Sequence, residues 1–267
     1  MKAKLFEAIE IGNVTFRNRV IMAPMCMYSA KEDGKVTDWH VTHYASRAVG
    51  GVGGVMLEAT AVTPDGRISA GDLGIWSDSQ IEGLRRIAEQ VQAAGAKAGV
   101  QLAHAGRKST TARPPVAPSP IAFDDSYGSP AELSIEDIKK IQQQFIDAAL
   151  RVEQAGYDFI ELHGAHGYLI NTFLSPLSNE RNDQYGGSLE NRMRFLLEIT
   201  EGIQAKSDIS LWVRISAADH APGGMTAADY IPLAQALVER GIDLLDCSSG
   251  AVVANAVPDV YPGYQVP

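Results

Sequence analysis

Residues 154–163, Gln-Ala-Gly-Tyr-Asp-Phe-Ile-Glu-Leu-His, decide the fold class of this 267-residue chain. A predicted helix ends at Gly156, and an apolar strand follows directly over 159–163. The same step from helix to glycine to apolar strand recurs at Gly95 and Gly241. Helices and strands that alternate in this way predict a parallel sheet, either closed into a barrel or doubly wound.

The predicted elements follow the same rhythm along the whole chain. Apolar segments without polar alternation are typical of parallel strands covered on both faces, and six are found, at 19–23, 54–59, 98–103, 159–163, 211–215 and 244–247. Segments with helical spacing separate them, at 38–49, 79–94, 134–154, 189–206 and 227–240. Residues 9–17 predict a hairpin with Gly12-Asn13 at its turn, placed to close the floor of a barrel.

Two features favour the barrel over the doubly wound sheet. Polar and unusual residues follow the predicted strands, as at 24–28, 104–108 and 163–168, and (β/α)8 barrels carry their active sites at that face. In addition, no GxGxxG turn follows the first strand. We therefore predict an α/β fold, a single (β/α)8 TIM-barrel domain over 1–267. Six strands are counted, so the chain is expected to stop before βα units seven and eight.

Composition excludes several classes of partner. The formal charge of −9 argues against a nucleic acid or an anionic membrane, because both would favour a basic face. No apolar run is long enough to span a bilayer, and no apolar targeting segment follows the first residues. Cys26 and Cys247 lie far apart outside any CxxC pattern, which indicates a reduced, cytoplasmic setting.

The strongest local signal lies at 161–168, Glu-Leu-His-Gly-Ala-His-Gly-Tyr. His163 and His166 follow a strand and converge if the chain turns into a helical loop, so that their N–H groups polarise one carbonyl oxygen. Tyr168, with a reference pKa near 10, can protonate a developing carbanion. A metal site would need ligands that the pattern lacks, so no metal is predicted. A metal site and a pair of structural histidines remain as alternatives.

Three more residues stand out by their position. Cys26 lies at the mouth of the first strand and is either a small buried hydrophobe or a thiol that touches a cofactor, whereas Cys247 is predicted as core. Gln101 lies within an apolar strand, where an unpaired amide costs on the order of 1–3 kcal/mol. Arg214 also lies within an apolar strand, so it must be paired or face a ligand, and Glu161 is a buried candidate partner.

Several motifs in order resemble those of the Old Yellow Enzyme family, over essentially the whole chain. They are Arg-Val-Ile-Met-Ala-Pro-Met-Cys-Met-Tyr at 19–28, Gln-Leu-Ala-His-Ala-Gly-Arg-Lys at 101–108, His-Gly-Ala-His-Gly-Tyr at 163–168, Phe-Leu-Ser-Pro-Leu-Ser-Asn at 173–179, Arg-Asn-Asp-Gln-Tyr-Gly-Gly-Ser at 181–188, Glu-Asn-Arg at 190–192 and Trp-Val-Arg-Ile-Ser at 212–216. Cys26 followed by Tyr28 resembles the thermophilic-like, xenobiotic-reductase subclass.

The resemblance implies an FMN-containing barrel that takes electrons from NADPH and reduces the C=C bond of α,β-unsaturated carbonyl or nitro compounds, an ene-reductase. It implies that His163 and His166 hydrogen-bond the substrate oxygen, that Tyr168 donates the proton and that Tyr28 lines the substrate pocket. It also implies a set of residues that contact the flavin: Pro24, Cys26, Ala59, Gln101 and Arg214. The implied partner is a small molecule, and a homo-oligomer is compatible with the sequence.

The expected absence of units seven and eight bears on the cofactor. The loops after those strands are the usual phosphate site of such barrels, so this chain alone is expected to bind FMN weakly. Unpaired strand edges are also expected to make the chain prone to aggregation. Two alternatives stay open: a catalytically incomplete barrel fragment that needs a complementary segment, and a flavoenzyme of the dienoyl-CoA reductase type. The pairing of Cys26 with Tyr28 argues against the second.

Overall fold

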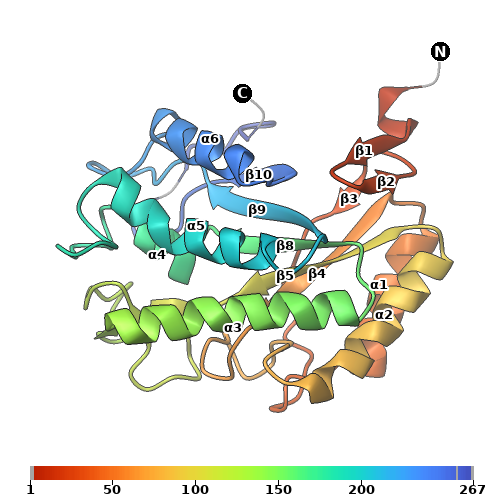
Figure 1. Cartoon of the computed structure of the whole chain (residues 1–267), viewed down its shortest axis with the longest axis horizontal. Helices are drawn as coiled ribbons and strands as arrows, with labels where there is room; N and C mark the ends of the chain where they lie inside the picture. The colour runs from red at the N-terminus through yellow and green to blue at the C-terminus, as the bar shows by residue number, and fades with distance from the viewer. Residues whose placement is uncertain (1–2, 257, 266–267) are drawn as a thin grey trace.

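A parallel sheet forms the centre of the computed structural model, which describes residues 3–256 and 258–265. Its strand order is β10-β9-β8-β5-β4-β3, and every neighbouring pair is parallel (Figure 1). The strands are β3 (Ile21–Met22), β4 (Gly54–Ala61), β5 (Lys97–Ala103), β8 (Phe159–Gly164), β9 (Ser210–Ser216) and β10 (Leu244–Ser248). Spatial order follows chain order, as in a barrel, whereas a doubly wound sheet reverses its order at a switch point. The predicted strands and fold class are confirmed.

Helices follow one another around this sheet in chain order (Figure 1). They are α1 (Asp38–Val49), α2 (Ile81–Ala93), α3 (Ile135–Gln154), the short α4 (Leu169–Leu174), α5 (Leu189–Gln204) and α6 (Ile231–Glu239). The predicted start of α3 is confirmed: the Asp137 amide donates to Ser134 Oγ at 3.1 Å. Such a cap satisfies one of the free amides of the first helical turn. Short elements fill the connections, among them β6 (Val116–Ala117) paired with β7 (Ala131–Glu132).

The predicted hairpin covers the start of the sheet. β1 (Ile9–Ile11) and β2 (Val14–Phe16) pair antiparallel, and Gly12 at the turn has a φ of 57°. The ring of Phe16 is fully buried, 5.4 Å from the ring centroid of Phe159 and 5.8 Å from that of Trp212. Because Phe159 opens β8, this aromatic cluster closes the amino-terminal end of the sheet, as predicted.

The sheet is curved, because residues from its two opposite edges line one cavity of about 280 Å³. Residues of both edge strands line this cavity, Ile21 from β3 and Leu244 from β10, together with Glu161 and Trp212 from the strands between them. Strands at opposite edges of a flat six-stranded sheet would lie too far apart to share one cavity. The side chains that point into the curl therefore converge, and the polar ones among them are brought together away from water.

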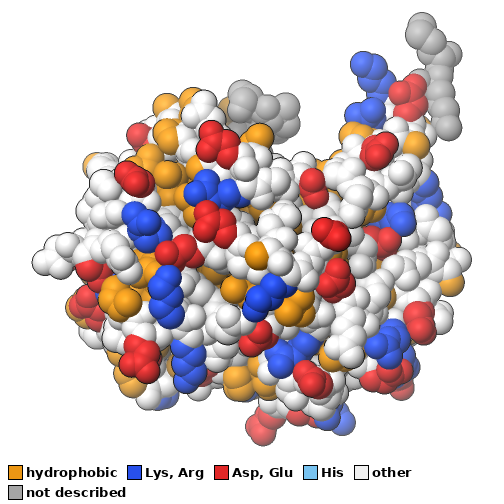
Figure 2. All heavy atoms as spheres, viewed as in Figure 1, with side chains coloured by type: hydrophobic (Ala, Val, Ile, Leu, Met, Phe, Trp, Pro, Cys, Tyr) orange, Lys and Arg blue, Asp and Glu red, His pale blue; other side chains and the backbone are white. Residues whose placement is uncertain are grey.

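The outer face carries charges of both signs, interspersed over α3 and α5 (Figure 2). Some of them link neighbouring helices: Lys139 Nζ lies 2.9 Å from Glu198 Oε2, and Arg240 Nε lies 2.7 Å from Glu201 Oε1. Such exposed pairs each contribute at most about 1 kcal/mol. Within the described residues, no helix is long and apolar enough to cross a membrane.

Candidate active site

The segment after β8 brings three predicted site residues together. Beyond Gly164 the chain turns sharply, with His166 at a φ of 59° and Gly167 at 72°, and α4 begins at Leu169. A side chain at Gly167 would collide with the carbonyl of Ala251, so this turn needs glycine. As a result the His163 ring lies 5.1 Å from the His166 ring at 83° and 4.8 Å from the Tyr168 ring at 88°. The convergence expected from the spacing is present.

Both imidazoles of this group are neutral near pH 7. Burial, followed by the nearby His166 and Arg214, holds the pKa of His163 well below its usual value. Burial, Arg214 and Lys108 lower the pKa of His166 to about 4. The Ala165 amide donates to His163 Nδ1 at 3.2 Å, and a backbone amide can only donate. The single proton of His163 therefore lies on Nε2, which leaves an N–H donor for a ligand.

Three contacts hold His166 in its left-handed conformation. Its amide donates to Ser216 Oγ at 2.9 Å, and its carbonyl accepts from Lys108 Nζ at 2.8 Å. Its ring Nε2 lies 2.6 Å from Ser248 Oγ. A non-glycine residue with positive φ costs about 1–2 kcal/mol, so it persists only where the surroundings fix it. Ser216, Lys108 and Ser248 belong to the polar residues after strands that predict the functional face, but no role could be assigned to any of the three from the sequence, because their partners lie far away in the chain.

Tyr168 keeps its phenolic proton at any physiological pH. Its side chain is mostly buried, and burial, followed by the neighbouring Cys26 and Tyr28, raises its pKa above the usual value of a tyrosine. A phenol in this state can donate a proton but cannot act as a base at neutral pH. The side chain is therefore suited to protonate a strongly basic centre, such as a carbanion.

Cys26 and Tyr28 lie in the loop after β3, close enough to Tyr168 to raise its pKa. Burial, with the carboxylates of Asp72 and Glu58, raises the pKa of the Cys26 thiol to about 12. Burial and the adjacent Cys26 raise the pKa of Tyr28 to about 12 as well. Tyr28 has a φ of 52° and is 53% exposed, so its ring borders open space. Both groups are neutral, and neither is a nucleophile at pH 7.

A buried network beneath this loop was missed by sequence reasoning. The Met27 amide donates to Glu58 Oε2 at 2.6 Å, and the Tyr44 hydroxyl donates to Oε1 at 3.1 Å. His40 Nε2 lies 3.4 Å from the same Oε1, while His40 Nδ1 accepts from the Thr37 amide at 3.1 Å. The signal that could have found it is a glutamate within the apolar strand 54–61, since a fully buried carboxylate needs donors.

The pairing of β4 with β5 explains how Glu58 reaches that loop. Leu57 faces Val100 and Ala59 faces Gln101, so the register shifts at Glu58. Such an irregularity re-aims one side chain of a strand and is common beside active sites. It also sets Ala59, which is buried, directly opposite Gln101.

Polar side chains line the inner face of the curl next to these residues. Gln101 Nε2 donates to Glu161 Oε1 at 2.7 Å, and both side chains are buried. Arg214 Nε lies 3.5 Å from Asp246 Oδ2. The ion pair of Arg214 is with Asp246, because the β9–β10 register places these two residues opposite each other, while the candidate partner Glu161 is only near enough for its pKa to be lowered by the charge of Arg214. Burial and Asp246 raise the pKa of Glu161 to about 8.

Comparison with known protein families identifies the family of this chain. The sequence profile of the NADH:flavin oxidoreductase / NADH oxidase family matches residues 4–266. The chain belongs to this flavin oxidoreductase family. Two curated relatives named NADPH dehydrogenase match the whole of this chain. The Geobacillus protein (strain WCH70) is 54% identical, with 78% of its own length covered. The Bacillus cytotoxicus protein is 55% identical, with 77% of its own length covered. The predicted family, oxidoreductase class, FMN cofactor and NADPH reductant are confirmed.

Solved structures agree with this membership. The old yellow enzyme homologue from Zymomonas mobilis is 31% identical with a TM-score of 0.85, over 98% of this chain and 79% of that chain. Morphinone reductase in complex with tetrahydroNAD is 30% identical with a TM-score of 0.83, over 92% and 74%. A 2-naphthoyl-CoA reductase is 31% identical with a TM-score of 0.90, over 94% of this chain and 41% of that chain.

The inner face of this flavin oxidoreductase carries one donor whose surroundings fit a flavin ring, the guanidinium of Arg214. Arg214 Nε is buried without a hydrogen-bond partner in the described parts of the chain. Its ion pair with Asp246, at 3.5 Å, is too long for a good hydrogen bond, so an acceptor on a bound ligand would supply the bond that Nε lacks. The pyrimidine edge of FMN carries such acceptors, so Arg214 fits the cofactor. Pro24 lines the same cavity as Glu161 and Asp246.

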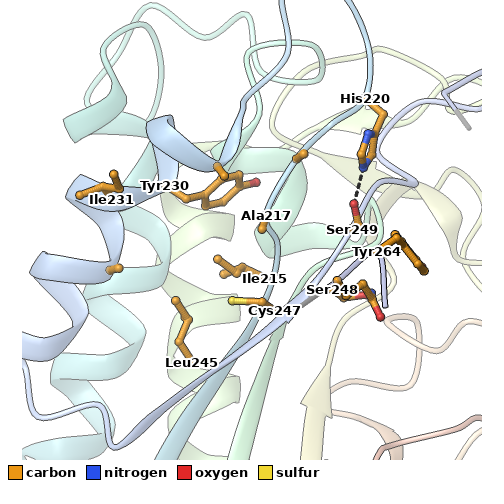
Figure 3. Close-up of a pocket in the computed structure, with 14 residues that line it drawn as sticks. Ile215, Ala217, His220, Tyr230, Ile231, Leu245, Cys247, Ser248, Ser249 and Tyr264 are labelled. Carbon is orange, nitrogen blue, oxygen red and sulfur yellow. Dashed lines mark hydrogen bonds between the residues drawn. The ribbon is translucent and has the colours of Figure 1, made fainter. Parts of the chain in front are cut away.

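A second cavity, of about 440 Å³, lies beside β9, β10 and α6 (Figure 3). Its lining is mostly apolar, with Ile215, Tyr230 and Leu245 among its residues, and none of the predicted catalytic residues lines it. Cys247 lines it and is exposed, so the prediction of Cys247 as a core residue is wrong.

Among residues 3–256 and 258–265, no cluster of three or more His, Cys, Asp or Glu could hold a metal ion.

Proposed function

We propose that this flavin oxidoreductase is an ene-reductase, which reduces the C=C bond of α,β-unsaturated carbonyl or nitro compounds with electrons from NADPH. The observation that carries the proposal is the perpendicular pair His163 and His166, 5.1 Å apart, with the protonated Tyr168 beside it. Two neutral donors and one acid, in a largely buried place, suit a substrate whose oxygen gains negative charge while one of its carbons needs a proton.

In this proposal the two histidines act on the substrate oxygen. His163 offers its Nε2–H, and His166 lies beside it with its backbone held by Ser216 and Lys108. Donors fixed in advance around a developing oxyanion lower the barrier without reorganising during the reaction. Withdrawal of charge onto the oxygen leaves the β-carbon electron-poor and ready to accept a hydride.

Bound FMN would supply that hydride, which it obtains from NADPH. Tyr168 then delivers its phenolic proton to the α-carbon, since its raised pKa keeps the proton in place until a strongly basic carbon forms. One hydride and one proton add across the double bond, and no group leaves. The phenol is reprotonated from solvent.

Residues of the inner face would hold the cofactor. Arg214 and Gln101 would meet the pyrimidine edge of the ring, and the backbones of Pro24 and Ala59 would approach it. Cys26 would lie against the ring as a neutral thiol, because its pKa is raised to about 12. Tyr28, half-exposed at the rim, would line the substrate pocket.

The proposal includes the setting of the protein. We place the enzyme in the cytoplasm, which its two free cysteines support, and we treat 1–267 as one domain. One buried apolar cluster extends from Met22 to Leu237, which supports the single domain.

The test uses the flavin spectrum of the purified chain. FMN is titrated in without oxygen, NADPH is added until the visible band bleaches, and cyclohexenone follows. Return of the band, with cyclohexanone formed in equal amount, supports an ene-reductase. A band that bleaches with NADPH and stays bleached with cyclohexenone and with a nitroalkene contradicts the substrate class but not the family.

A further inference from the structure

The two ring nitrogens of His166 have different surroundings. Nε2 lies 2.6 Å from the hydroxyl oxygen of Ser248, at the end of β10. For Nδ1, no hydrogen-bond partner is found in the described residues. A neutral imidazole has one donor nitrogen and one acceptor nitrogen. Whatever fixes the proton therefore decides whether His166 presents an N–H or a lone pair to a substrate oxygen.

The backbone and the ring of His166 are both held in place. The backbone of His166 is held at a φ of 59° by Ser216 Oγ on one side and Lys108 Nζ on the other. Ser216 is fixed in turn, because its hydroxyl donates to the Gly250 carbonyl at 2.8 Å. Ser248 is 7% exposed. The contact between His166 and Ser248 thus joins two buried or half-buried groups on fixed backbones.

The surroundings of Ser248 set the direction of the hydrogen bond. The side-chain amide of Gln265 lies with Nε2 3.4 Å from Ser248 Oγ, and an amide nitrogen can only donate. In the described part of the chain, the hydroxyl has no other partner than Gln265 and His166. The hydroxyl hydrogen then has one acceptor within reach in the described residues, an unprotonated His166 Nε2. Burial and the cations Arg214 and Lys108 oppose a second proton on the ring.

We propose that Ser248 is a positioning residue, which donates its hydroxyl to Nε2 of His166 and so keeps the ring proton on Nδ1. His163 carries its proton on Nε2, fixed by the Ala165 amide. The pair then presents two N–H groups, as an oxygen that gains charge requires. With the proton on Nε2, His166 would present a lone pair and repel that oxygen. The role in substrate binding rests on the proposed function, whereas the position of the proton is a property of the chain itself.

The proton can be located by NMR. The full chain is labelled with ¹⁵N-histidine, and long-range ¹H–¹⁵N correlations are recorded near pH 7, with the signals assigned by single substitutions. We expect His166 to be protonated on Nδ1 and His163 on Nε2. In Ser248→Ala the His166 proton should move to Nε2 in a substantial part of the molecules. Ser248→Thr retains the hydroxyl and should restore the Nδ1 form.

The neighbouring serine provides a matched control. The hydroxyl of Ser249, the residue after Ser248, contacts Nε2 of His220 in the same kind of pair, and in the described residues it has no hydrogen bond to His166 (Figure 3). Ser249→Ala should change the ring signals of His220 and leave those of His166 in place. If Ser248→Ala does not fold, the wild-type spectrum alone decides the proposal. A wild-type His166 protonated on Nε2 would overturn it, and so would a folded Ser248→Ala variant with an unchanged tautomer.

The loaded enzyme separates this inference from the proposed function. If both hold, Ser248→Ala should lower kcat/KM for cyclohexenone by the same factor as the Nδ1-protonated fraction of His166 falls in the NMR measurement, up to the order of 10²-fold that is typical of losing one oxyanion donor. Ser248→Thr should recover most of that loss. A chain with the expected tautomers that does not reduce cyclohexenone overturns the proposed function and leaves the role of Ser248 standing.

Discussion

The backbone amide of Met27 and the carboxylate of Glu58 are joined by a 2.6 Å hydrogen bond that ties the loop of Cys26 and Tyr28 to the neighbouring strand β4. Glu58 is 1% exposed, so this loop is anchored from inside the protein. Tyr28 adopts a left-handed backbone directly after the tethered residue. The positions of Cys26 and Tyr28 thus depend on the Glu58 carboxylate, which has no part of its own in the proposed reaction.

We expect Glu58→Leu to lower the free energy of unfolding by about 3 kcal/mol or more, because it leaves the Met27 amide and the Tyr44 hydroxyl without their acceptor. Hydrogen exchange over residues 24–30 should accelerate in parallel. Glu58→Gln is the matched control, since its amide oxygen still accepts from Met27, and it should retain most of the protection. Equal exchange in both variants would show that the hydrogen bond does not hold the loop.

Removal of the Tyr168 hydroxyl should separate the two halves of the proposed reaction. In Tyr168→Phe, reoxidation of the flavin by cyclohexenone should slow by about 10²–10⁴-fold, the usual contribution of one general acid. Reduction of the flavin by NADPH needs no proton from this residue and serves as the internal control. Stopped-flow absorbance measures both steps. An unchanged reoxidation rate would mean that another group supplies the proton.

Glu161 should make the stability of the cofactor-free chain depend on pH. Its folded-state pKa is raised to about 8 by burial and by Asp246, so the folded state keeps a proton that the unfolded state has lost. The contribution of Glu161 to stability therefore falls as pH rises toward 8, by up to roughly 1.4 kcal/mol per pH unit, and levels off above it, whereas the neutral His163 and His166 contribute a slope of the opposite sign near pH 6.5. Urea unfolding at pH 6.5, 7.0, 7.5 and 8.0 measures the net slope. Glu161→Gln should remove the negative contribution, whereas the exposed Glu180→Gln should not.

The two cysteines should differ in reactivity. The thiol of Cys26 is partly buried with a pKa raised to about 12, while Cys247 is exposed. Because the thiolate is the reactive form, iodoacetamide at pH 8 should label Cys247 well before Cys26. Peptide mass mapping over time measures the order. Earlier labelling of Cys26 would show that its loop opens to solvent more readily than the contacts of Met27 indicate.

Arg214 should contribute directly to flavin binding. Its Nε is buried and forms only a 3.5 Å ion pair with Asp246 and no hydrogen bond in the described residues, so a bound acceptor would gain a charged donor. Arg214→Met should weaken FMN binding by about 10-fold or more, measured by quenching of flavin fluorescence. Arg240→Met is the control, because that arginine pairs with Glu201 on the surface. Equal affinities in the two variants would place the flavin elsewhere.

Local patterns sufficed for much of the fold. The six strands and the hairpin follow from apolar runs and glycine stops, because burial on both faces of a parallel strand leaves a signature within the strand itself. The convergence of His163, His166 and Tyr168 could also be predicted, since six consecutive residues and one tight turn contain all three.

The partners of those residues were decided by tertiary structure alone. Ser248 lies 82 residues from His166, and Glu58 lies 31 residues from Met27, so no local period connects either pair. The β9–β10 register places Asp246, and not Glu161, opposite Arg214, where it forms the ion pair. A hydrogen bond requires its atoms to meet within a few tenths of an ångström. The sequence by itself therefore determined which segments form the sheet and which residues carry the chemistry, whereas the packed sheet decided which atoms hold them in place.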